Sequence, residues 1–400
     1  MADIQFFILD KSFQVVDIVD TFQSVIWNER YDECGDFEIY VDASIANLRR
    51  FPRGYYVYLE GSPSTMVIDQ VKIESDVEEG DHLVVTGRSL ESLLMRRVIP
   101  KHVIYKDDIQ TTIKTILTEN VISPSEARRK IDNFDFVTNS LSDTDPSTED
   151  GYEFDGDTVY DAIKTIVDSK GYGFRIALRG EEHWSNTKMA FEIYEGLDRS
   201  YEQDDNPYVV FSSNYGNLIS SNTTMDYREL YNAAYVGGSE QTKDNKTKRL
   251  VAYVPNQDGS TGWDYFETFY SASSVRYEDD EGNARPDDQV IAALKAEGID
   301  ELRQVGSGIS FDAEVSAVES MIYQTDYFIG DIVQIENNYN MSYKARITEY
   351  VRNWDTSSGY SEYPVLEVID VKYQSIDDSS GIPIRDDLDT PIHSSVETDY

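Results

Sequence analysis

Cysteine is almost absent from this chain of 400 residues. The single thiol, Cys34, excludes a disulfide within one chain. A nucleophilic role would need a histidine brought close by the fold, and the chain holds only four histidines. We therefore expect Cys34 to be a small, partly buried apolar residue.

Long hydrophobic runs and an export signal are also missing. No stretch of about 18 apolar residues occurs, which argues against a membrane-spanning helix. The N-terminal sequence MADIQFFILDKSF has no basic region before its short apolar stretch, so no secretory signal is expected. The chain is accordingly expected to be made in a cytoplasm.

Positive charge is scarce, since 35 Lys and Arg residues stand against 75 Asp and Glu residues, for a net charge of −40. Such an excess of carboxylates repels nucleic acid and anionic membranes. Two interpretations stay open. The carboxylates can simply keep the protein soluble, or they can line a surface past which DNA moves without being held by basic side chains.

Catalytic motifs are missing as well. The chain has no phosphate-binding Gly-x4-Gly-Lys-Ser/Thr, no Gly-x-Gly-x-x-Gly after a strand, no His-Glu-x-x-His and no Gly-x-Ser-x-Gly. With 75 acidic residues, carboxylate pairs suited to glycoside cleavage arise by chance and carry no signal. We expect no catalytic residues, no cofactor site and no enzyme activity. The four histidines stand alone and are expected to be surface or packing residues: His82, His102, His183 and His393.

Calcium is the one metal for which the sequence offers candidates. Glu149–Asp157 and Asp279–Gly282 are acidic loops that contain glycine. Oxygen-rich loops can bind calcium, but neither loop has the EF-hand spacing. Solvated loops are therefore expected, and calcium binding that stiffens the protein is kept as an alternative.

Tyrosine is abundant, with 29 residues against 16 Phe and 4 Trp. This usage favours strands and large assembled surfaces, because the tyrosine ring packs while its hydroxyl stays hydrated. Phe37, Ile39 and Val41 alternate with polar residues, as in a half-buried strand. Short strands at near-regular spacing predict a small barrel over residues 1–99. The candidates are 4–9, 13–19, 25–27, 36–41, 55–59, 66–73 and 82–86.

The pattern changes after residue 100. Asp107 and Asp108 precede a helical apolar face over 109–117, and Asp157 is expected to cap a second helix that ends at Gly171. Between them, 140–161 is rich in carboxylates and is expected to be a solvated loop. Strand-like segments follow at 172–178, 188–194 and 208–211, so residues 100–212 read as an α/β insertion domain.

Most of the remaining chain is again strand-like. Pro286 is expected to open a short helix near 286–304 that Gly298 interrupts. The expected strands are 218–223, 232–236, 250–254, 265–270, 309–315, 327–335, 343–351 and 365–373. The predicted fold is thus β-rich α+β, with a second barrel over 213–374 and a short acidic extended tail at 375–400.

Several stretches resemble, in their order and spacing, the hub proteins of phage tail tips, the tail-associated baseplate-hub family of siphophages, whose fold is shared with contractile-tail hubs. Gly330 and Asp331 in this pattern are read only as a turn that leads into a strand. The stretches are Trp27–Tyr31 with Gly35–Ile39, Gly87–Leu90 with Leu93–Arg97, Gly171–Phe174, Glu195–Arg199, Asn232–Gly238, and Tyr327–Val333 with Ala345–Val351.

The resemblance implies a homotrimer of two barrel domains per chain at the end of the tail tube, made in the host cytoplasm and carried in the virion. Its expected partners are the distal tail protein, the tape measure protein and the tail-tip or receptor-binding proteins, with DNA passing through unbound. The family often carries a C-terminal enzyme or fibre extension, which is not expected here. The alternatives are a receptor-binding or carbohydrate-binding adhesion module using Trp184 and Trp263, and a tail-associated cell-wall hydrolase.

Overall fold

The computed structural model is rich in β-strands and divides into two compact units. Unit 1 comprises Met1–Ser220, Ala313–Glu336 and Lys344–Ile369, and unit 2 comprises the rest of the chain. The structure describes residues 4–76, 80–146, 151–180, 186–225, 228, 231–243, 246–256, 260–272, 275–278, 284–304, 309–315, 321–337, 341–357 and 359–373.

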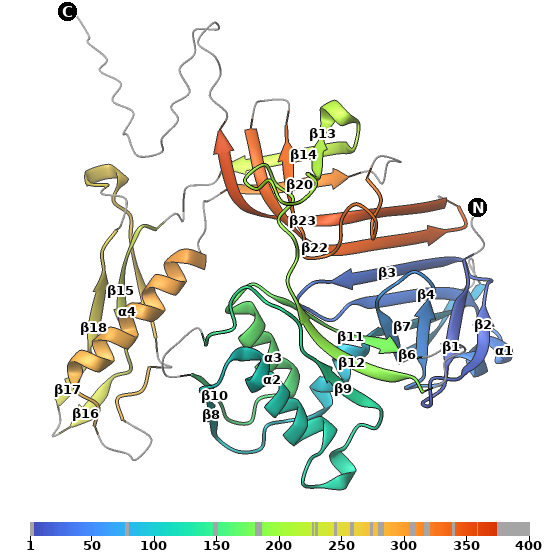
Figure 1. Ribbon diagram of the computed structural model, residues 1–400, viewed down its shortest axis with the longest axis horizontal. Helices are drawn as coiled ribbons and strands as arrows, with labels where there is room; N and C mark the ends of the chain where they lie inside the picture. Colours follow the sequence, from blue (N-terminus) through green and yellow to red (C-terminus); the bar gives the residue numbers. More distant parts are fainter. Residues whose placement is uncertain are drawn as a thin grey trace, which may run out of the picture. The chain divides into compact units, whose positions relative to one another are not determined.

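Unit 1 is built on one 11-stranded sheet with the order β13-β21-β22-β3-β4-β7-β6-β5-β1-β2, in which β23 also pairs with β22. In Figure 1 the strand β22 lies beside β3, with β23 on the other side of β22, although both come from the other end of the chain. The strands are β1 (Phe6–Leu9), β2 (Val15–Val19), β3 (Ser24–Arg30), β4 (Asp36–Asp42), β5 (Tyr56–Leu59), β6 (Thr65–Asp76), β7 (Gly80–Ser89), β13 (Val210–Ser212), β21 (Ile332–Glu336), β22 (Met341–Asp355) and β23 (Gly359–Tyr373).

Alternating side chains explain why these strands form. In β4 the predicted alternation is confirmed, since Phe37, Ile39 and Val41 are buried while Glu38 is exposed. Trp27 on β3 is fully buried beside Phe6 and Phe37, with ring centroids 5.9 Å apart in each pair. Because β3 and β4 contribute every second residue to this core, their register is fixed by burial. The short helix α1 (Ile45–Arg50) follows β4 with a Ser44 cap.

A smaller α/β layer follows in the chain. The helix α2 (Ile109–Leu117) is capped by Asp108, one of the two acidic residues expected to precede it, and continues into a short π-helix, η2 (Thr118–Ile122). The helix α3 (Val159–Asp168) is capped by Thr158 rather than by the predicted Asp157, because the Thr158 hydroxyl accepts the Asp161 N–H. The layer's other elements are η1 (Leu90–Arg96), β8 (Val103–Tyr105), η3 (Ala127–Arg129), β9 (Phe134–Val137), β10 (Tyr152–Phe154), β11 (Gly173–Arg179), β12 (Lys188–Tyr194) and η5 (Ser213–Tyr215).

The predicted solvated loop at 140–161 is only partly a loop. Within it, β10 pairs with β8, and Tyr152 and Phe154 are 7% and 5% exposed. Their side chains belong to the core that also buries the apolar faces of α2 and α3. The acidic residues around them had hidden this short strand in the sequence.

Unit 2 contains a three-stranded sheet with the order β18-β15-β19. One face buries Ala234, Val236 and Val254 against Val290 and Leu294 of the helix α4, which crosses β15 and β18 in Figure 1. The bounds are β15 (Ala233–Gly237), β18 (Val251–Val254), η6 (Gly262–Asp264), β19 (Glu267–Ser271) and α4 (Asp287–Gln304), with a small hairpin of β16 (Gln241–Lys243) and β17 (Lys246–Lys248). The strands β14 (Leu218–Met225) and β20 (Ile309–Val315) pair with each other, and each contains a position at which the chain is divided into the units.

The helix α4 runs through Gly298, which had been predicted to interrupt it. A Cβ atom at this position would lie 2.4 Å from Val236 Cγ2 and 2.9 Å from Val254 Cγ2. Glycine is therefore present because the helix passes close to the sheet here, and the cost of glycine within a helix is offset by that close packing.

The predicted β-rich fold is confirmed, but the closed barrels are not found. Within the described residues the large sheet is open, because its order ends at β13 and β2 and no pairing joins those two strands. The expected second barrel, 213–374, is divided between the two units, and its strands β21 to β23 join the sheet of β1 to β7. The predicted tail at 375–400 lies outside the described residues.

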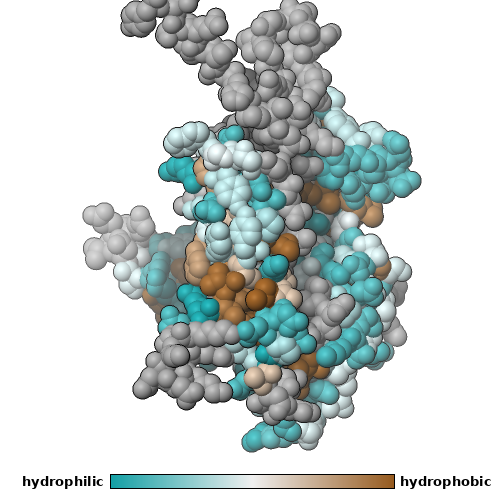
Figure 2. All heavy atoms as spheres, turned by 90° about the vertical axis from the view of Figure 1, so that its left-hand side faces the viewer, coloured by the Kyte–Doolittle hydropathy of each residue, from teal (hydrophilic) through white to brown (hydrophobic). Residues whose placement is uncertain are grey.

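Apolar side chains remain at the surface in several places, and Figure 2 shows some of them gathered among hydrophilic neighbours on the face that it presents. On β2, Val15, Val16 and Ile18 are 40%, 53% and 40% exposed. No helix among the described residues is long and apolar enough to cross a lipid bilayer.

Candidate functional site: a polar cavity where distant segments meet

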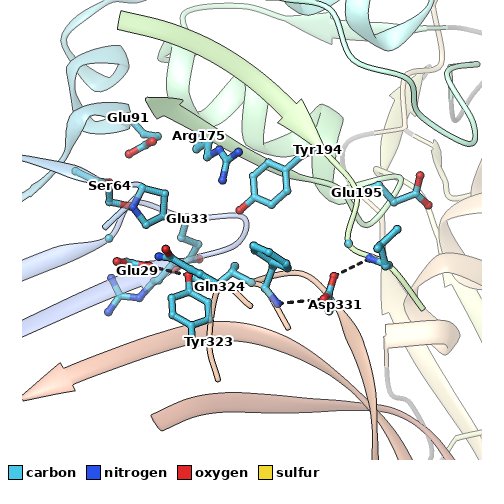
Figure 3. Close-up of a pocket in the computed structure, with 18 residues that line it drawn as sticks. Glu29, Glu33, Ser64, Glu91, Arg175, Tyr194, Glu195, Tyr323, Gln324 and Asp331 are labelled. Carbon is cyan, nitrogen blue, oxygen red and sulfur yellow. Dashed lines mark hydrogen bonds between the residues drawn. The ribbon is translucent and has the colours of Figure 1, made fainter. Parts of the chain in front are cut away.

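A cavity of about 390 Å³ lies within unit 1. It is lined by polar side chains from segments that are far apart in the sequence, and Figure 3 shows them converging on it. The lining comes from residues 29–35 at the end of β3, 63–64, 89–91 at the start of η1, 175 on β11, 194–197 after β12, and 323–331 before β21.

Glu29 is the centre of a buried hydrogen-bond network at the cavity wall and is only 1% exposed. Its Oε1 accepts hydrogen bonds from Arg352 Nη1 and from Ser62 Oγ, both at 2.5 Å, and its Oε2 accepts one from the Tyr323 hydroxyl at 2.7 Å. Burial and the Glu29 carboxylate raise the pKa of Tyr323 well above its usual value, so the phenol stays a donor. Every bond of this carboxylate is thus made to the protein itself.

Asp331 forms a second buried ion pair. Its Oδ2 accepts a hydrogen bond from Arg199 Nε at 2.7 Å, and both side chains are less than 10% exposed. Its two oxygens also accept the backbone N–H groups of Phe328 at 3.0 Å and Leu197 at 2.8 Å. The turn predicted for Asp331 is confirmed, whereas the pairing with Arg199 was missed, because 132 residues separate the two in sequence.

Tyr31 connects the large sheet with the smaller layer. Its ring packs against two glycines, since a Cβ atom at Gly173 or Gly330 would lie 2.4 or 2.3 Å from ring carbons of Tyr31. A Cβ atom at Gly196 would lie 1.9 Å from the Gly330 carbonyl oxygen. The Arg346 guanidinium lies 5.1 Å from the Tyr31 ring centroid. Five of the stretches that suggested the hub resemblance therefore meet at one point in space.

The edge of β11 is closed by groups of the large sheet and η1. In the part of the chain that the structure describes, β11 pairs with β12 alone, which leaves outward N–H groups on its other edge. The N–H of Phe174 is bonded to the Tyr31 carbonyl oxygen at 3.1 Å, and that of Ile176 to Glu91 Oε1 at 2.5 Å. Burial raises the pKa of the Glu91 carboxyl, and the nearby Ser89 hydroxyl opposes this increase. These bonds fix the smaller sheet to the larger one.

The arrangement is typical of a structural joint. The carboxylates of Glu29 and Asp331 are held by arginines, and Glu33 pairs with Lys164 at 3.3 Å. Neither histidine nor cysteine is among the residues that line the cavity. The arginine-bound carboxylates of Glu29 and Asp331 favour a rigid connection between these segments.

The candidates from the sequence lie elsewhere. Cys34 is buried, more completely than the partial burial predicted, and burial with the charge of Glu91 raises the pKa of its thiol to about 12. His82 packs against Tyr40 with ring centroids 5.0 Å apart, and His102 contacts Glu153 at 2.8 Å. Trp263 is 96% exposed. His183, His393 and Trp184 lie outside the described residues.

The calcium loops are only partly described. Asp279–Gly282, Glu149 and Asp150 lie outside the described residues. In the part of the chain that the structure covers, no group of three or more His, Cys, Asp or Glu side chains is arranged to hold a metal ion. Calcium binding therefore stays a prediction.

Comparison with known proteins gives a family and a fold. A family model described as Siphovirus ReqiPepy6 Gp37-like protein matches residues 5–363. The tail protein from Neisseria meningitidis MC58 is 12% identical, with a TM-score of 0.55 over 90% of this chain and 96% of its own. The 43 kDa tail protein of prophage MuSo2 from Shewanella oneidensis is 11% identical, with a TM-score of 0.56 over 92% of this chain and 98% of its own. No curated protein matches.

Proposed function

The chain belongs to the Siphovirus ReqiPepy6 Gp37-like family and has the fold of phage tail proteins, and from this premise we propose that it is a structural subunit of the tail-tip hub. Three copies would form a ring that closes or continues the tail tube and lets DNA pass. The observation that carries the proposal is the fold shared with two tail proteins. In each comparison the likeness covers at least nine tenths of this chain and of the tail protein.

The cavity supports a role as a scaffold. Buried ion pairs that depend on both partners, together with glycines that allow close backbone contact, give a joint that resists deformation. A subunit at the end of a tube must keep its shape while load passes through it. The net charge of −40 suits a passage for DNA, because basic side chains would bind the phosphates.

The edge strand β2 supports assembly. Among the described residues it pairs with β1 alone, and it exposes Val15, Val16 and Ile18, so that such an edge is a template for pairing with another chain. Burying it against a neighbouring copy would remove apolar surface from water. The interface is therefore expected to include this edge.

The test is the mass of the assembled protein and the effect of a charge on the edge strand. Wild-type protein should form a trimer by light scattering and a ring by electron microscopy. Val16→Lys should raise the dissociation constant of the assembly by roughly tenfold or more and so favour the monomer, since burying a lysine in the interface is costly. Ile45→Lys is the matched control, because Ile45 on α1 is 72% exposed in the single chain.

Circular dichroism should show that both variants fold. A wild-type protein that stays monomeric at high concentration, alone and with its tail neighbours, would contradict the trimer. The expected neighbours are the distal tail protein, the tape measure protein and receptor-binding proteins of the virion, and co-expression followed by co-purification tests each pair.

A second candidate function, receptor or carbohydrate binding, is favoured by an aromatic face on unit 2. Tyr235 on β15 lies opposite Tyr253 on β18 and opposite Phe269 on β19. The three side chains are 40%, 38% and 52% exposed in that order. Exposed rings can stack on sugars, and Trp263 is 96% exposed. A glycan array with wild type and Trp263→Ala tests this function. The wild type should bind a glycan, and the variant should lose that binding. No described arrangement of residues favours the cell-wall hydrolase.

A further inference from the structure

Two arginines of unit 1 lie side by side without a carboxylate partner. Arg97 follows η1 and Arg129 ends η3, and Arg97 Nε donates a hydrogen bond to the Arg129 carbonyl oxygen at 2.6 Å. Within the described residues, both guanidinium groups bond to neutral oxygens and neither forms an ion pair. The chain has 75 acidic residues, so the absence of a carboxylate beside both arginines is unexpected.

Neutral oxygens hold the two guanidinium groups in place. Arg97 Nη1 donates to the Arg96 carbonyl oxygen at 2.9 Å. Arg129 Nη2 donates to the Val98 carbonyl oxygen at 2.6 Å and to Asn120 Oδ1 at 3.0 Å. Each guanidinium has five N–H donors and uses two of them in these bonds. Both arginines are half-buried and not enclosed, so the other donors can reach a ligand from solvent.

Further cations surround the pair at exposed positions. The side chains of Arg96, Arg128 and Lys130 are 47%, 84% and 52% exposed. Including Arg88, six cations at this surface share three carboxylates, which leaves a local net charge of +3 on a chain of −40. The ion pairs are Arg88 and Arg96 with Asp69, Arg128 with Glu126, and Lys130 with Asp132.

Two positive charges held side by side repel each other, and an anion relieves the repulsion. Burial and the charges of Arg129 and Arg96 lower the pKa of Arg97. A phosphate monoester carries about two negative charges at pH 7 and three acceptor oxygens, whereas a carboxylate carries one charge. Two fixed guanidinium groups therefore match a phosphate group better than a carboxylate. Val98 beside them is 46% exposed and offers apolar contact to an organic part.

We propose that Arg97 and Arg129 bind a doubly charged phosphate group, with their free N–H groups donating hydrogen bonds to its oxygens. The phosphate is either the inorganic ion or the end group of a small organic molecule. This site goes beyond the structural role proposed above. It does not depend on assembly, because both arginines belong to unit 1 of a single chain.

The experiment is a calorimetric titration of the full chain with phenyl phosphate at pH 7.5 and low salt. Benzoate, which has the same ring but a single charge, is the control ligand. The wild type should bind phenyl phosphate at one site per chain, and benzoate by roughly tenfold or more less tightly. Added NaCl should weaken the binding, because salt screens the attraction.

Arg97→Gln and Arg129→Gln should each bind phenyl phosphate about tenfold more weakly, the loss expected for one charge-assisted hydrogen bond. Arg53→Gln, at an exposed turn of the same unit, is the matched control and should bind as the wild type does. Circular dichroism checks that the variants fold.

Glu126→Gln tests the site without touching the two arginines. The Glu126 side chain is 56% exposed and pairs with Arg128, so its loss should leave the fold intact. Removing this negative charge should tighten the binding of phenyl phosphate by about twofold.

No binding of phenyl phosphate, equal binding of benzoate, or unchanged affinity in the two arginine variants would overturn the proposal. Unchanged or weaker affinity in Glu126→Gln would overturn it as well, even if the arginine variants failed to fold. Inorganic phosphate that binds as tightly as phenyl phosphate would support the free ion as the ligand. Weaker binding of inorganic phosphate would support an organic phosphate that contacts Val98.

Discussion

Gly196 and Gly330 show how single residues set the geometry of unit 1. Their backbones approach so closely that a methyl group on Gly196 would overlap the Gly330 carbonyl oxygen. Gly330 also adopts a φ of +93°, which other residues rarely adopt, while it packs on Tyr31. Glycine at these positions is thus required by contact between segments and not only by a turn.

Gly196→Ala is expected to lower the free energy of unfolding by about 1–3 kcal/mol, the usual cost of forcing a methyl group into a packed interior. Urea denaturation measures the change. Gly156→Asn is the control, because nothing lies within 4 Å of a Cβ atom there and asparagine tolerates the left-handed backbone of Gly156. An unchanged midpoint for Gly196→Ala would show that the two segments are free to separate.

Glu91 gives a pH-dependent prediction. Burial raises the pKa of this carboxyl in the folded state, so between its ordinary value near 4.5 and its folded value the folded chain holds a proton that the unfolded chain has lost. Wild type therefore loses stability relative to Glu91→Gln as the pH rises through this window. We expect equal stabilities near pH 4 and an advantage of roughly 1–3 kcal/mol for Glu91→Gln at pH 7.

Urea midpoints of the two proteins, measured from pH 4 to pH 8, check this prediction. A constant difference across the range would mean that the carboxyl keeps one protonation state throughout.

Local signals allowed some residues to be predicted, and long-range pairs could not be. The Asp108 cap and the burial of Cys34 follow from neighbours in sequence or from residue type. The pairs of Asp331 with Arg199 and of Glu29 with Arg352 join residues 132 and 323 positions apart. In a chain with 75 acidic residues, no pattern marks which carboxylate will be buried.

At the scale of the element, apolar periodicity was the most dependable signal. A strong apolar repeat predicted α2 with its observed bounds, because its buried face is encoded in the spacing of its own residues. The strand β12 was also predicted with its observed bounds, but as an apolar run that is buried on both faces. The helix α4 was predicted to break at Gly298, since propensity alone treats glycine as a helix breaker. Its packing against the sheet was not visible in the local sequence.

The substitution Gly298→Ala distinguishes helix propensity from close packing, because the two predict changes of opposite sign in the free energy of unfolding. Helix propensity predicts a gain of about 1 kcal/mol, whereas the 2.4 Å approach of a Cβ atom to Val236 predicts a loss of about 1–3 kcal/mol. We expect the loss, measured as thermal unfolding of unit 2. Val236→Ala creates space, so the double variant should be less destabilised than the sum of the single ones. Additive effects would place Gly298 away from Val236.

At the scale of the whole molecule, charge is expected to oppose assembly. Each chain carries a net charge of −40, so three chains carry three times that, −120. Salt screens this repulsion. Raising NaCl from 0.05 to 0.5 M should strengthen self-association by roughly tenfold or more, as measured by sedimentation over a concentration series. Weaker association at high salt would indicate an interface held by ion pairs.

The β-rich character could be read from the sequence, but the arrangement of the strands could not. Short strands at regular spacing suggested that neighbours in sequence close into two barrels. Instead β22 pairs with β3, from Glu349 opposite Arg30 to Asp355 opposite Ser24. Strand pairing across more than 300 residues leaves no trace in local sequence patterns. Any strand with the same alternation of apolar and polar residues could pair with either edge of β3.

The pairing of β3 with β22 also has a consequence for biosynthesis. The strands β1 to β7 are made first, yet β22, the second neighbour of β3, pairs with it through residues 349–355, which are translated about 260 residues after the end of β7. Until then, β3 presents a vacant edge to the cell, and such nascent chains are prone to aggregate. Completion of the sheet therefore waits until β22 has been made, and a chaperone that shields β3 until then would raise the yield of native protein.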